Sequence, residues 1–182
     1  ALSDDLLMQV ASVLRDEVTT TDELIPSGET SSYRSNPLKL AEFALSRRDP
    51  DYVPRAKATQ ALETACAAGT VMPELQAVLM ALHLPESALA RMHIGSVIFA
   101  NKPGDGSARE QAASCQRVLG GCANICYEFA TKRYRSNCIN WGMLPFLVEN
   151  PGALDNGDYV YLPGVRKALL EAADELDAVA VK

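Results

Sequence analysis

The stretch Gly-Asp-Gly-Ser-Ala-Arg-Glu-Gln-Ala-Ala occupies residues 104–113 and follows an apolar run, Gly-Ser-Val-Ile-Phe-Ala-Asn, at residues 95–101. An apolar run, a pair of glycines and a helix-compatible segment in this order predict a strand, a tight turn and a helix. The backbone N–H groups of a first helical turn lack intrahelical partners and attract anions. Glycine allows a steep turn and lets a ligand approach the backbone closely. The stretch therefore predicts an anion site to which Ser107 and Arg109 supply a hydroxyl and a guanidinium.

The turn by itself leaves a second interpretation open. A short glycine motif is weak evidence for a ligand, and the same residues fit an ordinary strand–helix connection. Ser107 would then cap the helix, and Arg109 would be a surface charge. Residues elsewhere in the chain are needed to decide between the two interpretations.

The rest of the chain alternates predicted strands and helices. Residues 6–14 fit a strand or a helix by periodicity alone, and residues 19–34, rich in Thr, Ser, Gly and Pro, predict an irregular loop. Helices are predicted at residues 38–46, 55–67, 73–84, 108–119 and 165–176, and strands from residue 94 onward and at residues 124–129 and 158–162. This alternation is typical of an α/β protein.

The residues from Val97 to Phe146 resemble the swivel domain of the aconitase and isopropylmalate isomerase superfamily. In that family a Gly-x-Gly-Ser-Ser-Arg-Glu turn precedes a helix, a strand and a segment that ends in Gly-Leu/Met-Leu-Pro. The corresponding pieces here are Gly104–Glu110, Leu119-Gly120-Gly121, Asn124–Phe129, Arg135-Ser136-Asn137 and Gly142-Met143-Leu144-Pro145. A second match lies upstream, where Val18–Ile25 resembles the family's Val-Thr-Thr-Asp-His-Ile stretch and is followed by Gly28 and Arg34.

The resemblance implies an α/β fold of the β/β/α swivelling type, like domain 4 of aconitase. It makes residues 1–182 a single swivel-like domain and favours a strand at residues 6–14. The helical block at about residues 38–90 separates the two family motifs and is then an extra insertion, to which we assign no function.

The resemblance also implies a hydro-lyase, an enzyme that removes water from a hydroxy-acid and adds it back in a shifted position. Ser107 matches the catalytic base, and Asp22 matches a residue that supports the active site. Arg34 and Arg109 match arginines that bind substrate carboxylates, a task that suits the planar guanidinium group. We expect the substrate to be a hydroxy di- or tricarboxylic acid.

The substrate-binding turn departs from the family at one position. Gly106 and Ala108 match residues of that turn, but Ala108 stands where the family has its second serine, so one hydroxyl donor to the substrate is missing. Glu23 stands where many relatives carry histidine. The first interpretation is the swivel domain of an aconitase-like hydratase. Two alternatives stay open: a stand-alone small subunit of an isopropylmalate isomerase-like enzyme, and a non-catalytic carboxylate-binding or regulatory domain, which Ala108 favours.

In the family a [4Fe–4S] cluster on other domains binds the leaving hydroxyl. We therefore expect the cluster ligands to lie outside this chain, on cluster-bearing aconitase-type domains of the same longer chain or of a large subunit. The chain alone is then predicted to be inactive. Its five cysteines, at positions 66, 115, 122, 126 and 138, and its two histidines fit no zinc or iron–sulfur spacing, so the sequence predicts no metal site within the chain.

The composition is that of a compact globular domain: 182 residues, 48% hydrophobic and 22% charged. A net charge of −6 argues against a general nucleic-acid or membrane-surface function. The sequence contains no apolar window of membrane-spanning length and no basic start of a signal peptide. An odd number of cysteines without a Cys-x-x-Cys pair favours reduced thiols and a cytoplasmic location.

Overall fold

A six-stranded sheet forms the centre of the computed structural model, which describes residues 2–26, 28, 31–33, 35–149 and 154–182. The strand order is β6-β5-β3-β1-β7-β8. The bounds are β1 Asp5–Leu14, β3 Met92–Ala100, β5 Gly121–Cys126, β6 Leu144–Leu147, β7 Tyr159–Leu162 and β8 Val179–Val181. The first four of these run parallel, whereas β7 pairs antiparallel with β1 and β8 antiparallel with β7. The predicted α/β fold class is confirmed, as is the strand at residues 6–14.

A small second sheet joins two segments that are far apart in the sequence. It consists of β2 (Thr19–Thr20) and β4 (Pro103–Asp105), which run parallel to each other. β2 leads directly into a short helix, α1 (Thr21–Leu24), whose first turn is capped by the Thr20 hydroxyl. The prediction of an irregular loop from residue 19 was therefore wrong for its first part, because this cap and the pairing with β4 order the chain there.

Most of the longer helices agree with the sequence. The longer helices are α2 (Pro37–Ala41), α3 (Tyr52–Ala67), α4 (Pro73–Ala81), α5 (Arg109–Val118), α6 (Lys132–Asn140) and α7 (Val165–Leu170), of which α6 was not predicted, and 3₁₀ turns lie at Ser31–Tyr33 and Glu86–Arg91. Three predicted helices are too long. The helix at 73–84 ends at Ala81, before His83 takes a positive φ of 57°. The helix at 38–46 ends at Ala41, before Leu45 takes a positive φ of 56°, and the helix at 165–176 ends at Leu170, before Ala172 takes a positive φ of 51°. A non-glycine residue in that conformation does not continue an α-helix.

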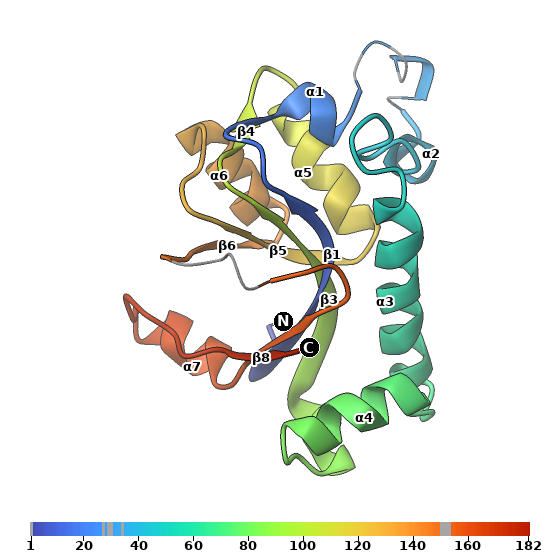
Figure 1. The fold of residues 1–182 in the computed structure, drawn as a ribbon, viewed down its shortest axis with the longest axis vertical. Helices are drawn as coiled ribbons and strands as arrows, with labels where there is room; N and C mark the ends of the chain where they lie inside the picture. Colours follow the sequence, from blue (N-terminus) through green and yellow to red (C-terminus); the bar gives the residue numbers. More distant parts are fainter. Residues whose placement is uncertain (1, 27, 29–30, 34, 150–153) are drawn as a thin grey trace.

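The two faces of the sheet are covered by different elements. Side chains alternate across a strand, so Leu7 of β1 packs with Leu62 of α3 and Leu75 of α4, whereas Leu6 packs on the opposite face with Val165 of α7. In Figure 1, α3 and α4 lie on one side of the sheet and α7 on the other. α5 and α6 lie toward the carboxyl ends of the parallel strands, where they enclose a further part of the core with β1 and β3.

None of the helices in the part of the chain that the structure describes is long and apolar enough to cross a membrane.

Candidate functional site

Three loops meet where the parallel strands β1, β3 and β5 end. Asn101, which follows β3, links them through its backbone and side chain. Its N–H donates to the carbonyl of Leu14 at 3.3 Å, its amide Nδ2 donates to the carbonyl of Arg15 at 2.8 Å, and its carbonyl accepts from the N–H of Tyr127 at 3.2 Å. The carboxyl edge of a parallel sheet is the usual place for a ligand site in α/β folds. The glycine turn, the Thr-rich segment after β1 and the start of α6 all lie at this edge.

The two sequence motifs are in direct contact. The backbone N–H of Thr19 donates to the carbonyl of Lys102 at 2.9 Å, and Thr20 lies opposite Asp105 in the β2–β4 pair. Gly106 then passes so close to Thr21 that a Cβ atom at position 106 would lie 2.3 Å from the Thr21 hydroxyl oxygen. With a φ of +126°, this position also requires a backbone conformation that L-residues avoid. The glycine is therefore dictated by the approach of the other motif.

Ser107 stands exposed just before α5 and does not cap it. The N-cap residue is Ala108, which provides no side-chain hydrogen bond, and no other described side chain caps the first N–H groups of α5. The Ser107 hydroxyl likewise makes no hydrogen bond with any residue that the structure describes. Ala108 is half-buried and packs against the core beside α5. The helix-capping interpretation of Ser107 is thus wrong, and the turn presents an unused hydroxyl next to unused helix N–H groups.

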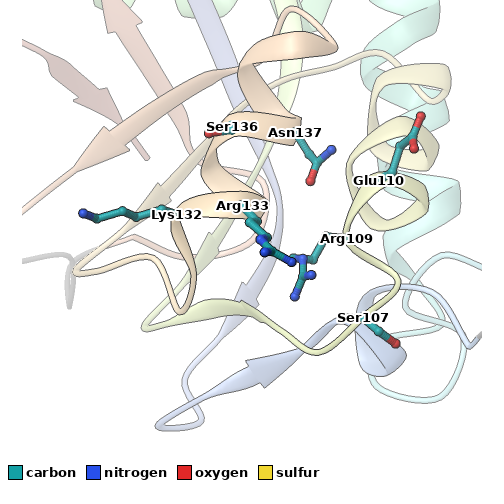
Figure 2. Close-up of a pocket in the computed structure, with 7 residues that line it drawn as sticks. All are labelled: Ser107, Arg109, Glu110, Lys132, Arg133, Ser136 and Asn137. Atoms are coloured by element: carbon teal, nitrogen blue, oxygen red, sulfur yellow. The ribbon is translucent and has the colours of Figure 1, made fainter.

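An open pocket of about 480 Å³ lies between the start of α5 and the start of α6. Its lining consists of charged and polar side chains, namely Ser107, Arg109, Glu110, Lys132, Arg133, Ser136 and Asn137. Figure 2 shows the guanidinium groups of Arg109 and Arg133 converging from the two helices, with the Asn137 amide above them. Ser107 lies at the rim, and its hydroxyl points away from the two arginines in this view.

The pocket is positively charged although the chain as a whole is acidic. Three cations and one carboxylate line it, against a net charge of −6 for the whole chain. Arg109 donates to the carbonyl of Gly106. Within the described residues, no ion pair joins Arg109, Lys132 or Arg133 to a carboxylate. Such a lining suits an anionic ligand held by charge-assisted hydrogen bonds.

A buried set of three polar side chains fixes the position of α6. The Tyr134 hydroxyl donates to Asn124 Oδ1 at 2.6 Å and accepts from Gln116 Nε2 at 2.9 Å, while Asn124 Nδ2 donates to Gln116 Oε1 at 2.7 Å. These residues connect α6, β5 and α5. The Tyr134 ring also packs onto Gly104, where a Cβ atom would lie 2.3 Å from the ring. The glycine turn and α6, which carry the two sides of the pocket, are therefore locked together.

Four of the five cysteines are buried in the core. Burial raises the pKa of Cys115 and of Cys138 to about 11 and that of Cys122 and of Cys126 to about 12. Among the residues with a described position, no three His, Cys, Asp or Glu side chains come together in a metal-binding arrangement.

The structure brings together only some of the residues expected at the site. The turn contains Gly106, Ser107, Ala108 and Arg109. Of these, Ser107 and Arg109 line the pocket. Asp22 lies in the first turn of α1, exposed, with its Oδ2 accepting from Arg47 at 2.9 Å, and it is not part of the pocket lining. Arg34 lies outside the described residues.

Sequence reasoning missed the contribution of α6. Lys132 and Arg133 were not among the residues expected at the site. The sequence contained a signal, because Tyr134 and Cys138 are four residues apart and would share one face of a helix. In the structure both are buried on the inward face of α6, and the two basic residues form its exposed first turn.

Comparisons with known proteins give a family match over part of the chain and a fold match over most of it. Residues 88–151 match the family model described as the aconitase C-terminal domain. No curated protein sequence matches the chain. Among solved structures, the chain is similar to 3-isopropylmalate dehydratase from Methanocaldococcus jannaschii, with 19% identity and a TM-score of 0.53, over 98% of this chain and 83% of that one. At this level of identity the structural likeness shows the fold alone.

Proposed function

We propose that the chain is the swivel domain of a hydro-lyase of the aconitase and isopropylmalate isomerase superfamily, acting on a hydroxy di- or tricarboxylic acid; the family match over residues 88–151 supports this. The observation that carries this proposal is the pairing of β2 with β4, which joins the Thr-Thr-Thr-Asp segment to the glycine turn. That pairing leaves Ser107 exposed beside Arg109 and the uncapped start of α5. The arrangement provides a hydroxyl and an anion-binding group at one point of the surface.

We assign Ser107 the role of the base that takes a proton from the substrate. Removing a proton next to a carboxylate adds negative charge to an acid that is already anionic. The Arg109 guanidinium and the N–H groups at the start of α5 stabilise such charge, and the same positive surroundings favour the ionised form of the Ser107 hydroxyl. Arg109, together with Arg34, binds the substrate carboxylates in this proposal, and Asp22 supports the site from α1.

We place the [4Fe–4S] cluster expected for the family on partner domains rather than on this chain. Its iron would need several cysteine thiolates close together, and among the described residues no three His, Cys, Asp or Glu side chains lie together in such a group. The partner is then a set of cluster-bearing aconitase-type domains, which belong either to the same longer chain or to a separate large subunit. In both arrangements this chain alone is inactive.

Turnover by the complete protein with its partner domains tests the proposal. The protein is reconstituted with iron and sulfide without oxygen and is offered hydroxy tricarboxylates and alkylmalates, while the ultraviolet absorbance of the unsaturated product is followed. We expect Ser107→Ala to lower kcat by about 100-fold or more, as general acid–base groups contribute on this order. An intact cluster spectrum in the variant shows that the loss arises at Ser107.

A matched control is Ser87→Ala, which changes an exposed serine in the 3₁₀ turn before β3 and should leave kcat unchanged. If Ser107→Ala is as active as Ser87→Ala, or if no acid is turned over by the wild type, the catalytic proposal is wrong. The non-catalytic carboxylate-binding role would then take its place.

A further inference from the structure

We propose that Arg133 on α6 is a further carboxylate anchor, which faces Arg109 across the pocket and binds a carboxylate that an acid with only one carboxylate does not have. The inference rests on the proposed function, because it places the distal part of the same substrate. It adds to the glycine turn a substrate-contacting residue from a different helix.

The first reason is position. Arg133 and Arg109 line the same pocket from opposite sides, one at the start of α6 and the other at the start of α5. Figure 2 shows their guanidinium groups converging, whereas Lys132 points away from them. A carboxylate bound at Ser107 and Arg109 would leave Arg133 facing whatever extends from the substrate across the pocket.

The second reason is charge. Half of the ten arginines of the described chain form ion pairs: Arg15 with Asp155, Arg47 with Asp22, Arg48 with Asp16, Arg55 with Asp49 and Arg166 with Asp4. No ion pair in the described residues neutralises Arg109 or Arg133, although acidic residues outnumber basic ones by 23 to 17. Two like charges that converge repel each other. A ligand with two carboxylates removes that repulsion, and a monocarboxylate removes only part of it.

The third reason is rigidity. Arg133 is the residue before Tyr134, whose hydroxyl is held by Asn124 and Gln116 in the core. The backbone N–H of Tyr134 also donates to the Thr131 hydroxyl, at 3.0 Å, which caps α6. The start of α6 is therefore fixed before a ligand arrives. Anchors on rigid elements bind with less loss of conformational entropy than anchors on loops.

Titration of the complete protein with unreactive acids tests this inference. The probes are tricarballylate, with three carboxylates, and butyrate, with one. Losing one charge-assisted hydrogen bond to a carboxylate should raise a dissociation constant about tenfold. We expect Arg133→Gln to raise the dissociation constant of tricarballylate by about that factor and to leave that of butyrate nearly unchanged, as measured by isothermal titration calorimetry.

Arg135→Gln is the matched control. Arg135 is also an exposed arginine of α6, but it does not line the pocket. It should therefore alter the binding of neither probe, whereas a purely long-range effect of charge would appear in both variants. The inference is overturned if Arg133→Gln weakens both acids equally, if it weakens neither, or if the wild type does not bind tricarballylate.

Turnover separates a failure of this inference from a failure of the proposed function. Turnover that depends on Ser107, with the ratio of kcat/KM between acids unchanged in Arg133→Gln, would contradict the role of Arg133 and support the hydro-lyase function. Binding of tricarballylate that depends on Arg133, without turnover of any acid, would support the role of Arg133 and contradict the hydro-lyase function.

Discussion

Buried contacts join the glycine turn to α6, whereas exposed ion pairs hold the acidic face of α1. On the first side, Tyr134 is fully buried and meets Gly104, Gln116 and Asn124. On the second side, Asp22 pairs with Arg47 at 2.9 Å, and the two side chains are 55% and 44% exposed. A buried polar group that loses its partner costs far more free energy than an exposed ion pair that opens. Buried hydrogen bonds therefore fix the pocket side of the site, whereas on α1, whose Leu24 is buried in the core, the exposed Asp22 side chain makes a contact that water and salt weaken.

The largest effect in this comparison should follow from Gly104→Ala. A methyl group at position 104 would lie 2.3 Å from the Tyr134 ring, and the φ of +101° strains any L-residue there. Strain and overpacking together should lower the free energy of unfolding by about 4 kcal/mol, measured by urea denaturation. This is a large part of the stability of an ordinary domain.

Gly142→Ala separates the contact from the backbone strain. Gly142 also has a positive φ, +77°, but a Cβ atom there would meet nothing within 4 Å. This variant should lose only about 1 kcal/mol. Equal losses in the two variants would mean that the packing of Tyr134 on the turn contributes nothing.

A smaller loss should follow from Tyr134→Phe. The ring stays, but Asn124 Oδ1 loses the hydroxyl that donates to it at 2.6 Å, in a region closed to water. The unsatisfied group should cost about 2 kcal/mol in urea denaturation, and the amide protons at the start of α6 should exchange faster with solvent.

Tyr127→Phe serves as the comparison for Tyr134→Phe, because Tyr127 is 45% exposed. Its hydroxyl can be replaced by water, so its removal should change stability by less than about 0.5 kcal/mol. If the two variants unfold at the same urea concentration, the buried polar set does not hold α6.

The fold was more predictable than the means by which the site is held. The strand before the glycine turn follows from an unbroken apolar run, and the helix after it from Ala and Gln spacing, which are local properties of the sequence. The family motifs also placed Ser107 and Arg109 in one turn. The β2–β4 contact between the two motifs depends on residues about 85 positions apart, so only the resemblance could indicate it.

Tyr134, Gln116 and Asn124 show why the rest was hidden. Each has a polar side chain that reads as partly exposed when taken alone, and each is buried only because the other two satisfy its hydrogen bonds. Strand β8 was missed for a similar reason. Its three residues, Val179–Val181, carry no periodicity, and their strand conformation comes from pairing with β7.

The smallest effect concerns the α1 side. Arg47→Gln removes one cation that pairs with Asp22, and an exposed pair contributes about 0.5 kcal/mol or less. We expect this loss at low salt and none at 1 M salt, where charges a few ångströms apart are largely screened. The change should also be local, with faster hydrogen exchange in α1 and unchanged exchange in α6.

Lys57→Gln is the control, since its pair with Glu42 has similar exposure, 49% and 48%, but does not involve α1. It should lose as much stability without changing exchange in α1. If hydrogen exchange in α6 were accelerated as much as in α1 in Arg47→Gln, the two sides of the site would open as one unit. The contrast between buried and exposed contacts would then be wrong.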